Sequence, residues 1–365
     1  MKELRLQKVN KIISVRCAIG MLCLAIISAG CSSIGPGTVP TDKFDYNGAI
    51  AEAQQQELLL NLVRLRYREP PVFLRVSSVI SQYSRVASTT ATAGFNTGLT
   101  GNDTAVVGGR LAWSDRPVIT YTPISGQEFS RNLLTPLPPR ALFRLTQSGW
   151  SSQLVFRSAT MSFNGLGNDS ARLSYRQQGD PALFEMLEIW QRLREARVLD
   201  ASVQGGQKSG DLVLFVNPLK LDEAAQGEMR RFRELLGVRE GVNEFRIVQG
   251  LLPQSDDEIA VLTGSLWDIM LNLAWQFDAP AEHVTDGRTG STFRSSQFDG
   301  RPPIQIRHST EEPVDTYAKV FTQNYWFYID NADMDSKQAF SFLQLLLSLA
   351  ETSVPDRAPV LTISN

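Results

Sequence analysis

Two histidines are the residues best suited to acid–base or nucleophilic chemistry in this chain, and neither lies in a catalytic motif. His283 and His308 both occur in a stretch rich in Gly, Ser and Pro. A histidine that activates a nucleophile needs a Ser or Cys partner and an orienting acid, but the chain has no G-x-S-x-G motif. The metal-binding patterns His-x-x-x-His and His-Glu-x-x-His are also absent. We therefore predict two surface histidines, and no catalytic residue, metal site or cofactor.

A second candidate is a calcium loop near the C-terminus. Asn331, Asp333 and Asp335 have the required spacing, but Ser336 stands where such a loop needs Gly and Phe342 where it needs Glu. An apolar helix is expected to follow directly. Asp333 or Asp335 is therefore better interpreted as the residue that caps this helix.

Two basic features could bind anions. Arg64, Arg66 and Arg68 lie near the end of a predicted helix, where we expect them to be solvated and to complement the helix dipole. The segment GGQKS at 205–209 differs from a phosphate-binding loop, because its Lys does not directly follow a Gly and a strand is expected next. Neither feature is predicted to be a binding site.

Four consecutive aromatic residues begin at Tyr325. Strand alternation places Trp326 and Tyr328 on one face and Tyr325 and Phe327 on the other. Apolar residues on both faces predict a central strand covered on both sides. The alternative is that Trp326 and Tyr328 stack on a ligand such as a glycan.

The first 30 residues have the composition of a secretory signal peptide. A basic start is followed by an apolar stretch from Cys17 to Gly30, which is shorter than the about 20 residues that cross a bilayer as a helix. Small residues then precede Cys31. Cleavage there would remove Cys17 and Cys23, so no disulfide could form within the mature chain.

This pattern resembles the signal peptide of a bacterial lipoprotein. The resemblance implies that Cys31 is lipidated with fatty acyl groups such as palmitate and becomes the N-terminus. Ser32, in place of an Asp that retains lipoproteins at the inner membrane, implies an anchor on the periplasmic face of the outer membrane. Because Ser28 stands where these signals usually have Leu, secretion with an unmodified Cys31 and an uncleaved anchor stay open.

Length and charge limit the remaining possibilities. A formal net charge of −2 gives no basic field for nucleic acid. The length suits more than one domain. We predict a signal peptide at 1–30, a lipidated tether at 31–46, a helical region with a long hairpin at 47–164, and a compact domain at 165–365. The first helix is expected to begin at Asn47.

The segment from 84 to 122 predicts a long β-hairpin. Residues 84–99 are rich in Ala, Ser, Thr and Gly, residues 100–104 form a polar turn, and residues 105–122 return as a second extended segment. A lone hairpin with so few bulky side chains is unstable. It therefore either packs on the body, or pairs edge to edge with copies from other chains in a multimeric β-barrel or a ring. The alternative is a flexible surface arm or a sheet edge in a soluble domain.

The region after residue 165 predicts an α+β fold, with a mixed sheet packed with helices. Apolar stripes predict helices after Asp180, over 225–236, after Ser265 and over 340–349. A helix is also favoured over 152–164. Strands are predicted over 72–83, 212–216, 245–248, 259–262, 304–307, 319–329 and 360–363.

Several stretches resemble one family of uncharacterised bacterial proteins. They are YWFYIDNADMDSKQAFSFLQLLLSLA followed by APVLTISN, SDRPVITYTPISGQEF, and LLLNLVRLRYREPPVFL. This resemblance implies a coherent fold and no particular activity.

The sequence thus favours a non-enzymatic, lipid-anchored protein that acts by assembly through its 84–122 hairpin. Its expected partners are the membrane, through the N-terminal lipid, and either copies of itself or an outer-membrane protein. An envelope hydrolase that uses carboxylates and a ligand- or glycan-binding lipoprotein are the alternatives.

Overall fold

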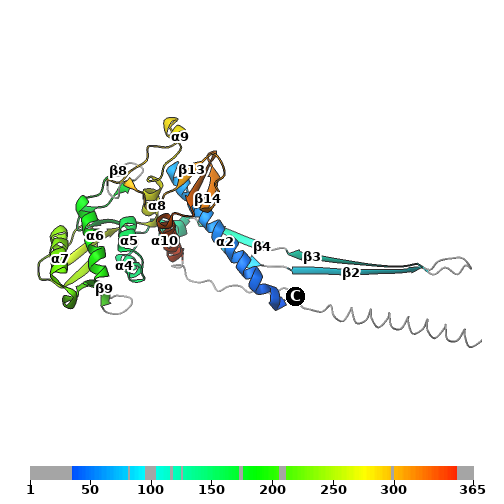
Figure 1. The fold of residues 1–365 in the computed structure, drawn as a ribbon, viewed down its shortest axis with the longest axis horizontal. Coiled ribbons are helices and arrows are strands. Elements are labelled where there is room, and N and C mark those ends of the chain that lie inside the picture. Colours follow the sequence, from blue (N-terminus) through cyan, green and yellow to red (C-terminus); the bar gives the residue numbers. More distant parts are fainter. Residues whose placement is uncertain are drawn as a thin grey trace, which may run out of the picture. The chain divides into compact units, whose positions relative to one another are not determined.

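The computed structural model describes residues 35–80, 83–94, 104–115, 118–124, 126–171, 176–204, 211–296 and 300–351. The chain divides into two compact units, residues 1–54 and 55–365. The predicted boundary between residues 164 and 165 falls within the second unit. This unit combines helices with a six-stranded mixed sheet and smaller sheets (Figure 1). The predicted α+β class is therefore confirmed.

Helix α2 (Gly35–Arg66) begins earlier than the predicted start at Asn47. Residues 35–46 are therefore helical where the sequence predicts the end of a tether. Pro36 is compatible with this start, because a proline in the first turn lacks only an N–H that would have no partner there. Most residues from Phe44 to Gln54 are exposed.

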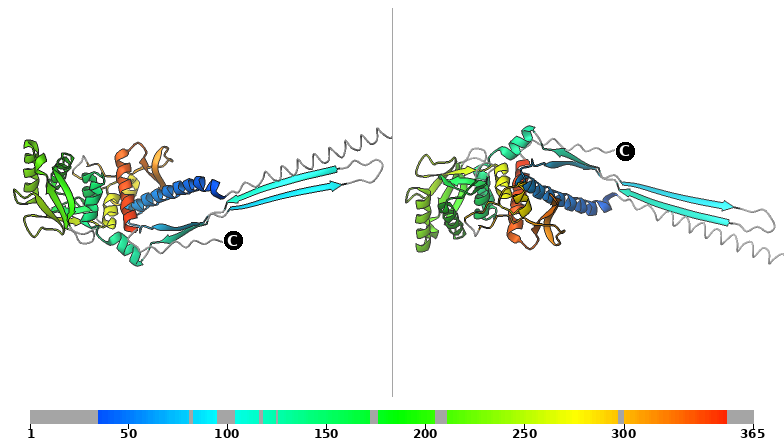
Figure 2. Two further views of the ribbon diagram at one scale, coloured as in Figure 1. Left: turned by 90° about the horizontal axis from the view of Figure 1, so that it is seen from below. Right: turned by 90° about the horizontal axis from the view of Figure 1, so that it is seen from above.

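Two antiparallel strand pairs follow α2. The strands are β1 (Leu74–Ile80), β2 (Tyr83–Gly94), β3 (Thr104–Asp115) and β4 (Val118–Pro123). β1 pairs with β4, and β2 pairs with β3 over 12 residue pairs without a register shift. Both views in Figure 2 show β2 and β3 side by side along their length. The long hairpin predicted near residues 84–122 is confirmed, but its second strand ends at Asp115, and residues 118–122 pair with β1 instead.

The largest sheet has the strand order β6-β5-β12-β11-β10-β9. Only β11 and β12 pair in parallel. The strands are β5 (Thr160–Phe163), β6 (Leu166–Gly167), β9 (Leu199–Gln204), β10 (Asp211–Val216), β11 (Glu244–Gln249) and β12 (Glu258–Thr263). β7 (Ser170–Ala171) and β8 (Arg176–Gln177) form a separate pair.

Helices precede, separate and follow the strands of this sheet in the sequence. They are α3 (Gly126–Phe129), the π-helix η1 (Ser130–Leu134), α4 (Pro139–Gln147), α5 (Ser152–Ala159), α6 (Pro181–Glu195), the 3-10 helix η2 (Pro218–Lys220), α7 (Glu223–Leu236) and α8 (Leu266–Ala274). Two of these helices have ends that local residues define. Ser265 and Asp268 form a capping box at α8, and Gly237 ends α7 in the left-handed conformation, with φ of 64°.

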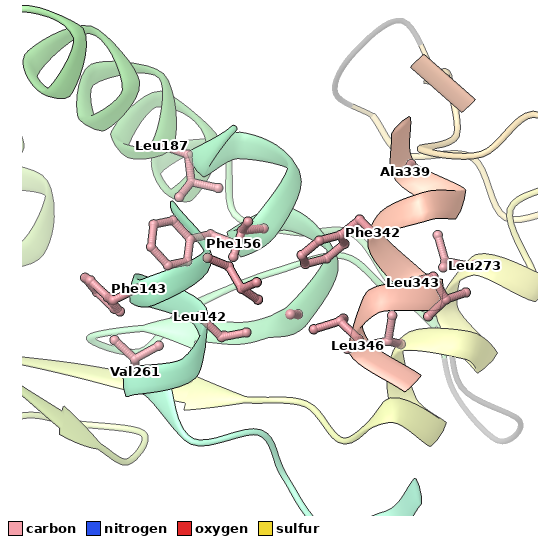
Figure 3. Close-up of a cluster of buried hydrophobic side chains, with 14 of the residues drawn as sticks. Leu142, Phe143, Phe156, Leu187, Val261, Leu273, Ala339, Phe342, Leu343 and Leu346 are labelled. Carbon is pink, nitrogen blue, oxygen red and sulfur yellow. The ribbon is translucent and has the colours of Figure 1, made fainter. Parts of the chain in front are cut away.

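One hydrophobic core joins residues from most of the second unit. In Figure 3, Phe156 of α5 lies between Leu142 and Phe143 of α4 and Leu187 of α6, while Phe342, Leu343 and Leu346 face the same cluster from another helix. Five rings of this core pack edge to face or tilted, with centroids 5.1 to 6.3 Å apart. They are Phe143, Phe156, Phe163, Trp190 and Phe232.

The predicted helix over 152–164 is only half correct. α5 ends at Ala159, and β5 begins at Thr160. Thr160 is β-branched and pairs with Thr263 of β12. Sheet pairing therefore decides the conformation of a segment whose local pattern is ambiguous.

A three-stranded antiparallel sheet, β13-β15-β14, precedes the last described helix. Its strands are β13 (Arg307–Ser309), β14 (Thr316–Thr322) and β15 (Tyr325–Asp330), with α9 (Ala281–Thr285) before and α10 (Met334–Glu351) after them. The single strand predicted over 319–329 is two strands, because Gln323 and Asn324, with φ of 53° and 64°, form the turn between them. The strand predicted over 360–363 lies outside the described residues.

Among the helices that the structure describes, none is both long enough and apolar enough to span a bilayer.

Candidate functional site

The structure describes some of the predicted site residues and not others. Cys31 and the segment 205–209 lie outside the described residues. Trp326 and Tyr328, both histidines and the candidate calcium residues are described. No group of three or more His, Cys, Asp or Glu side chains suited to a metal ion occurs among them.

Asp333 has the predicted capping role. Its carboxylate accepts from the backbone N–H of Ser336 at 3.1 Å and from the Ser336 hydroxyl at 2.8 Å, at the start of α10. The Ser336 hydroxyl oxygen in turn accepts from the backbone N–H of Gln305. These bonds occupy the carboxylate as a helix cap.

Trp326 and Tyr328 lie on one face of β15, as predicted, and both are half-buried. The opposite face carries Phe327 and Ile329, which are fully buried in the core. β15 is central in its sheet, but the prediction that both of its faces are covered is wrong. The reason is that only the face with Phe327 packs against the hydrophobic core of the second unit, which we call the body where the β2–β3 hairpin is left out.

The exposed side of this sheet forms an aromatic patch. Phe321, which is 57% exposed, packs on Trp326 with ring centroids 5.3 Å apart. The Lys319 Nζ lies 5.5 Å from the centroid of the Trp326 ring. We call Trp326, Tyr328, Phe321 and Lys319 the aromatic patch.

His283 is fully buried, so the prediction of a surface histidine is wrong for it. The Tyr67 hydroxyl lies 2.6 Å from His283 Nδ1 and donates to it in the tautomer protonated at Nε2. Burial raises the pKa of Tyr67 to about 12. Burial, with a smaller contribution from Arg288, lowers the pKa of His283. The pair is neutral and joins the residue that follows α2 to α9.

His308 lines a cavity of about 200 Å³ together with Asp278, Arg294 and Arg307. Asp278 pairs with Arg294 at 2.5 Å. The hydrolase considered above would use carboxylates, and the carboxylate in this lining, that of Asp278, is held in the ion pair with Arg294. This cavity therefore gives no support to the envelope hydrolase.

Arg66 is also fully buried, against the prediction of a solvated helix end. Its guanidinium carbon lies 4.7 Å from the centroid of the Trp275 ring, and its terminal nitrogens donate to the hydroxyls of Thr289 at 3.2 Å and Thr292 at 3.3 Å. The Thr289 hydroxyl donates to the Arg66 carbonyl at 2.7 Å. Contacts more than 200 residues away in sequence thus fix the end of α2.

Two further arginines approach the same ring. The guanidinium carbons of Arg176 and Arg68 lie 4.5 Å and 5.7 Å from the Trp275 centroid. A Cβ on Gly290 would lie 3.1 Å from Arg176 Nη2 and 3.2 Å from the Trp275 ring, so any other residue would require these neighbours to shift by a few tenths of an ångström. We call Arg66, Arg68, Arg176 and Trp275 the arginine cluster.

The β2–β3 hairpin differs from the side-chain sites above, because the groups that it could use for binding are those of its backbone. In the part of the chain that the structure describes, the two strands form a sheet of their own. A sheet of two strands has two outer edges, each with a row of N–H and C=O groups directed away from the ladder.

Sequence reasoning finds the hairpin and the aromatic strand but not the arginine cluster. The available signal was the Arg-x-Arg-x-Arg spacing at 64–68, which on a helix cannot place all three side chains on one exposed face. Its aromatic partner, Trp275, follows the end of α8 and is not marked by any motif.

In comparisons with known proteins, no family model, no curated protein and no solved structure matches this chain.

Proposed function

We propose that this chain is a lipid-anchored structural protein on the periplasmic face of the outer membrane, anchored through Cys31, and that it assembles with copies of itself through the β2–β3 hairpin. The leader sequence supports the location. The hairpin supports the mode of action.

The main support for assembly is the ladder of β2 and β3, which form a separate two-stranded sheet with 12 antiparallel residue pairs. A two-stranded hairpin is at best marginally stable in water, and three or more strands are needed for independent stability. Strand β2 consists mainly of Ala, Ser, Thr and Gly, which offer little apolar surface to bury. Additional strands are therefore the most direct source of stability.

Copies of the same hairpin can supply these strands. The free edge of β2 in one protomer can pair with the free edge of β3 in the next, which is a head-to-tail contact that closes into a ring when the rotation permits. Each added protomer then satisfies the edge groups of its neighbour. Anchoring in one membrane would raise the local concentration of the copies.

A clean deletion tests the proposal. Removing residues 83–115 leaves Ser81, Gln82, Arg116 and Pro117 as a four-residue connection between Ile80 and Val118, which are paired in the β1–β4 ladder. Light scattering on detergent-purified full-length protein is expected to show an oligomer, and on the deletion variant a monomer with an unchanged circular dichroism spectrum. A monomeric full-length protein, or a deletion variant that stays oligomeric, would refute the proposal.

A matched control shortens the hairpin and keeps both strands. Replacing residues 95–103 by Asn-Gly joins Gly94 to Thr104, the last pair of the ladder, by a two-residue turn. This variant is expected to remain oligomeric. Co-purification of a stoichiometric outer-membrane protein, with loss of that protein in the deletion variant, would replace self-assembly by a heterologous partner.

The aromatic patch favours a second candidate, a glycan-binding lipoprotein. Sugars stack on exposed aromatic faces, and Trp326 with Phe321 offers such a surface beside the Lys319 ammonium. Retention on immobilised peptidoglycan fragments is expected to be lost in Trp326→Ala with the fold intact. Tyr121→Ala, at a half-exposed aromatic residue outside the patch, is the control. Equal retention of both variants would exclude this candidate.

A further inference from the structure

The arginine cluster gathers three positive charges around one indole ring. The Cζ atoms of Arg66, Arg68 and Arg176 lie within 5.7 Å of the Trp275 centroid. Trp275 and Arg66 are fully buried, whereas Arg68 and Arg176 are exposed. The cluster therefore has a buried base and a solvent-facing side, both formed by residues of the second unit.

Within the described residues, the hydrogen-bond acceptors of the cluster are neutral. Arg66 donates to two threonine hydroxyls, and Arg176 donates to the carbonyl of Ser291 at 2.8 Å and to its hydroxyl at 3.2 Å. The Nε of Arg66 and the Nε1 of Trp275 are buried and have no hydrogen-bond partner. Buried charge with neutral partners and unmet donors is costly unless an anion completes the site.

The carboxylate that acts on Arg66, that of Asp278, and the carboxylate of Asp286, which acts on the neighbouring Tyr67, are already paired with other arginines. Asp278 pairs with Arg294 at 2.5 Å, and Asp286 pairs with Arg288 at 2.6 Å. The pKa of Arg66 is lowered to about 10, first by burial and then by repulsion from Arg176, against smaller raising contributions from Tyr67 and Asp278. The Arg176 guanidinium is therefore close enough to act on Arg66 electrostatically.

We propose that the arginine cluster binds the phosphate group of a ligand, with Arg68 and Arg176 in contact with it and Arg66 adding charge from below. A guanidinium presents a planar fork that matches phosphate oxygens. A phosphate monoester carries more charge than a carboxylate and has three terminal oxygens, so it can contact two arginines at once. This inference is independent of assembly through the hairpin.

Isothermal titration calorimetry on the full-length protein in chloride buffer tests the proposal with two probes. Inorganic phosphate represents a free anion, and dihexanoyl phosphatidic acid, used below its micelle concentration, represents a lipid headgroup. Binding of both indicates that the phosphate group suffices, and binding of the lipid alone identifies a headgroup site. Either result supports the proposal, whereas binding of neither probe at millimolar concentration overturns it.

Substitutions locate the binding. Arg68→Gln and Arg176→Gln are each expected to weaken binding by about 10-fold, since each removes a charge-assisted hydrogen bond. Arg230→Gln, at an exposed arginine of α7, should leave the affinity unchanged. Arg68 has only the ring contact in the described structure, so its variant is expected to fold even where that of Arg176 does not. Unchanged affinity in Arg68→Gln, or equally tight binding of acetate by the full-length protein, would contradict the assignment.

Discussion

The Trp190 ring cluster and the β2–β3 ladder show two different ways in which this chain holds its structure. Around Trp190, large apolar rings from α4, α5, β5 and α7 exclude water from one another, and the stabilising energy comes from within the protomer. In the ladder, backbone hydrogen bonds join two strands, one of them built mainly from small residues. Such bonds add little net stability in water. On the proposed function, the body is self-sufficient, whereas the hairpin would gain its stability from additional strands.

The largest expected effect is on the body. Trp190→Ala removes the ring that contacts four others and leaves a cavity, so it should lower the free energy of unfolding by about 3 to 5 kcal/mol. Urea denaturation followed by circular dichroism measures this change. The same substitution in the protein lacking residues 83–115 should cost as much, since the cluster has no member in the hairpin. A much smaller cost there would show that the two regions share their stability.

Tyr67→Phe tests a polar contact within the body. It leaves His283 Nδ1 buried without its partner at 2.6 Å, which should cost about 1 to 3 kcal/mol. Tyr121→Phe, at a half-exposed tyrosine of β4, is the control and should cost almost nothing. Equal costs in denaturant unfolding would mean that the buried hydroxyl does not stabilise the fold.

The pH dependence of the unfolding free energy should also arise from groups outside the hairpin. The pKa of His283 is lower in the folded protein, chiefly through burial, than its unfolded value of about 6.5. Between these two values the unfolded state binds more protons, so stability rises with pH and is lost as the pH falls below about 6.5.

His283→Gln should flatten this slope, and thermal unfolding between pH 4 and 8 measures it, with ~0.5-unit steps sufficient to resolve the change. His308 has a pKa lowered by burial as well, so His308→Gln is the comparison and should remove its own share. Both effects are expected to persist without residues 83–115. A slope that His283→Gln leaves unchanged would contradict the assignment.

The sequence predicts the elements whose signals are local. The capping box of Ser265 and Asp268, the cap at Asp333 and the left-handed Gly237 all act within a few residues of their positions. The existence of the hairpin is also a local signal, because it joins adjacent segments, but its register differs from the predicted one, since Thr104 pairs with Gly94 instead of belonging to the turn. These features needed no knowledge of distant contacts.

Burial of Arg66 and His283 could not be predicted in the same way. Arg66 bonds to Thr289, 223 positions along the chain, and Tyr67 bonds to His283, 216 positions along it. The turn at Gln323 and Asn324 was missed for another reason: glutamine is not a typical residue at positive φ, and the aromatic run conceals the interruption.

A proline in the hairpin should have the smallest effect on the stability of the body, and it tests most directly whether the two regions are independent. Ala91→Pro lies in the middle of the β2–β3 ladder, opposite Val107. A proline there lacks an N–H, so it either breaks the ladder or removes a donor from the outer edge. In both cases assembly should be lost, while the unfolding free energy of the body should change by less than about 0.5 kcal/mol, as for a substitution that affects no core contact. If the body of a monomeric variant instead loses several kcal/mol, then the hairpin stabilises its own protomer. Edge pairing between copies would then no longer be required to explain why so long a two-stranded ladder exists.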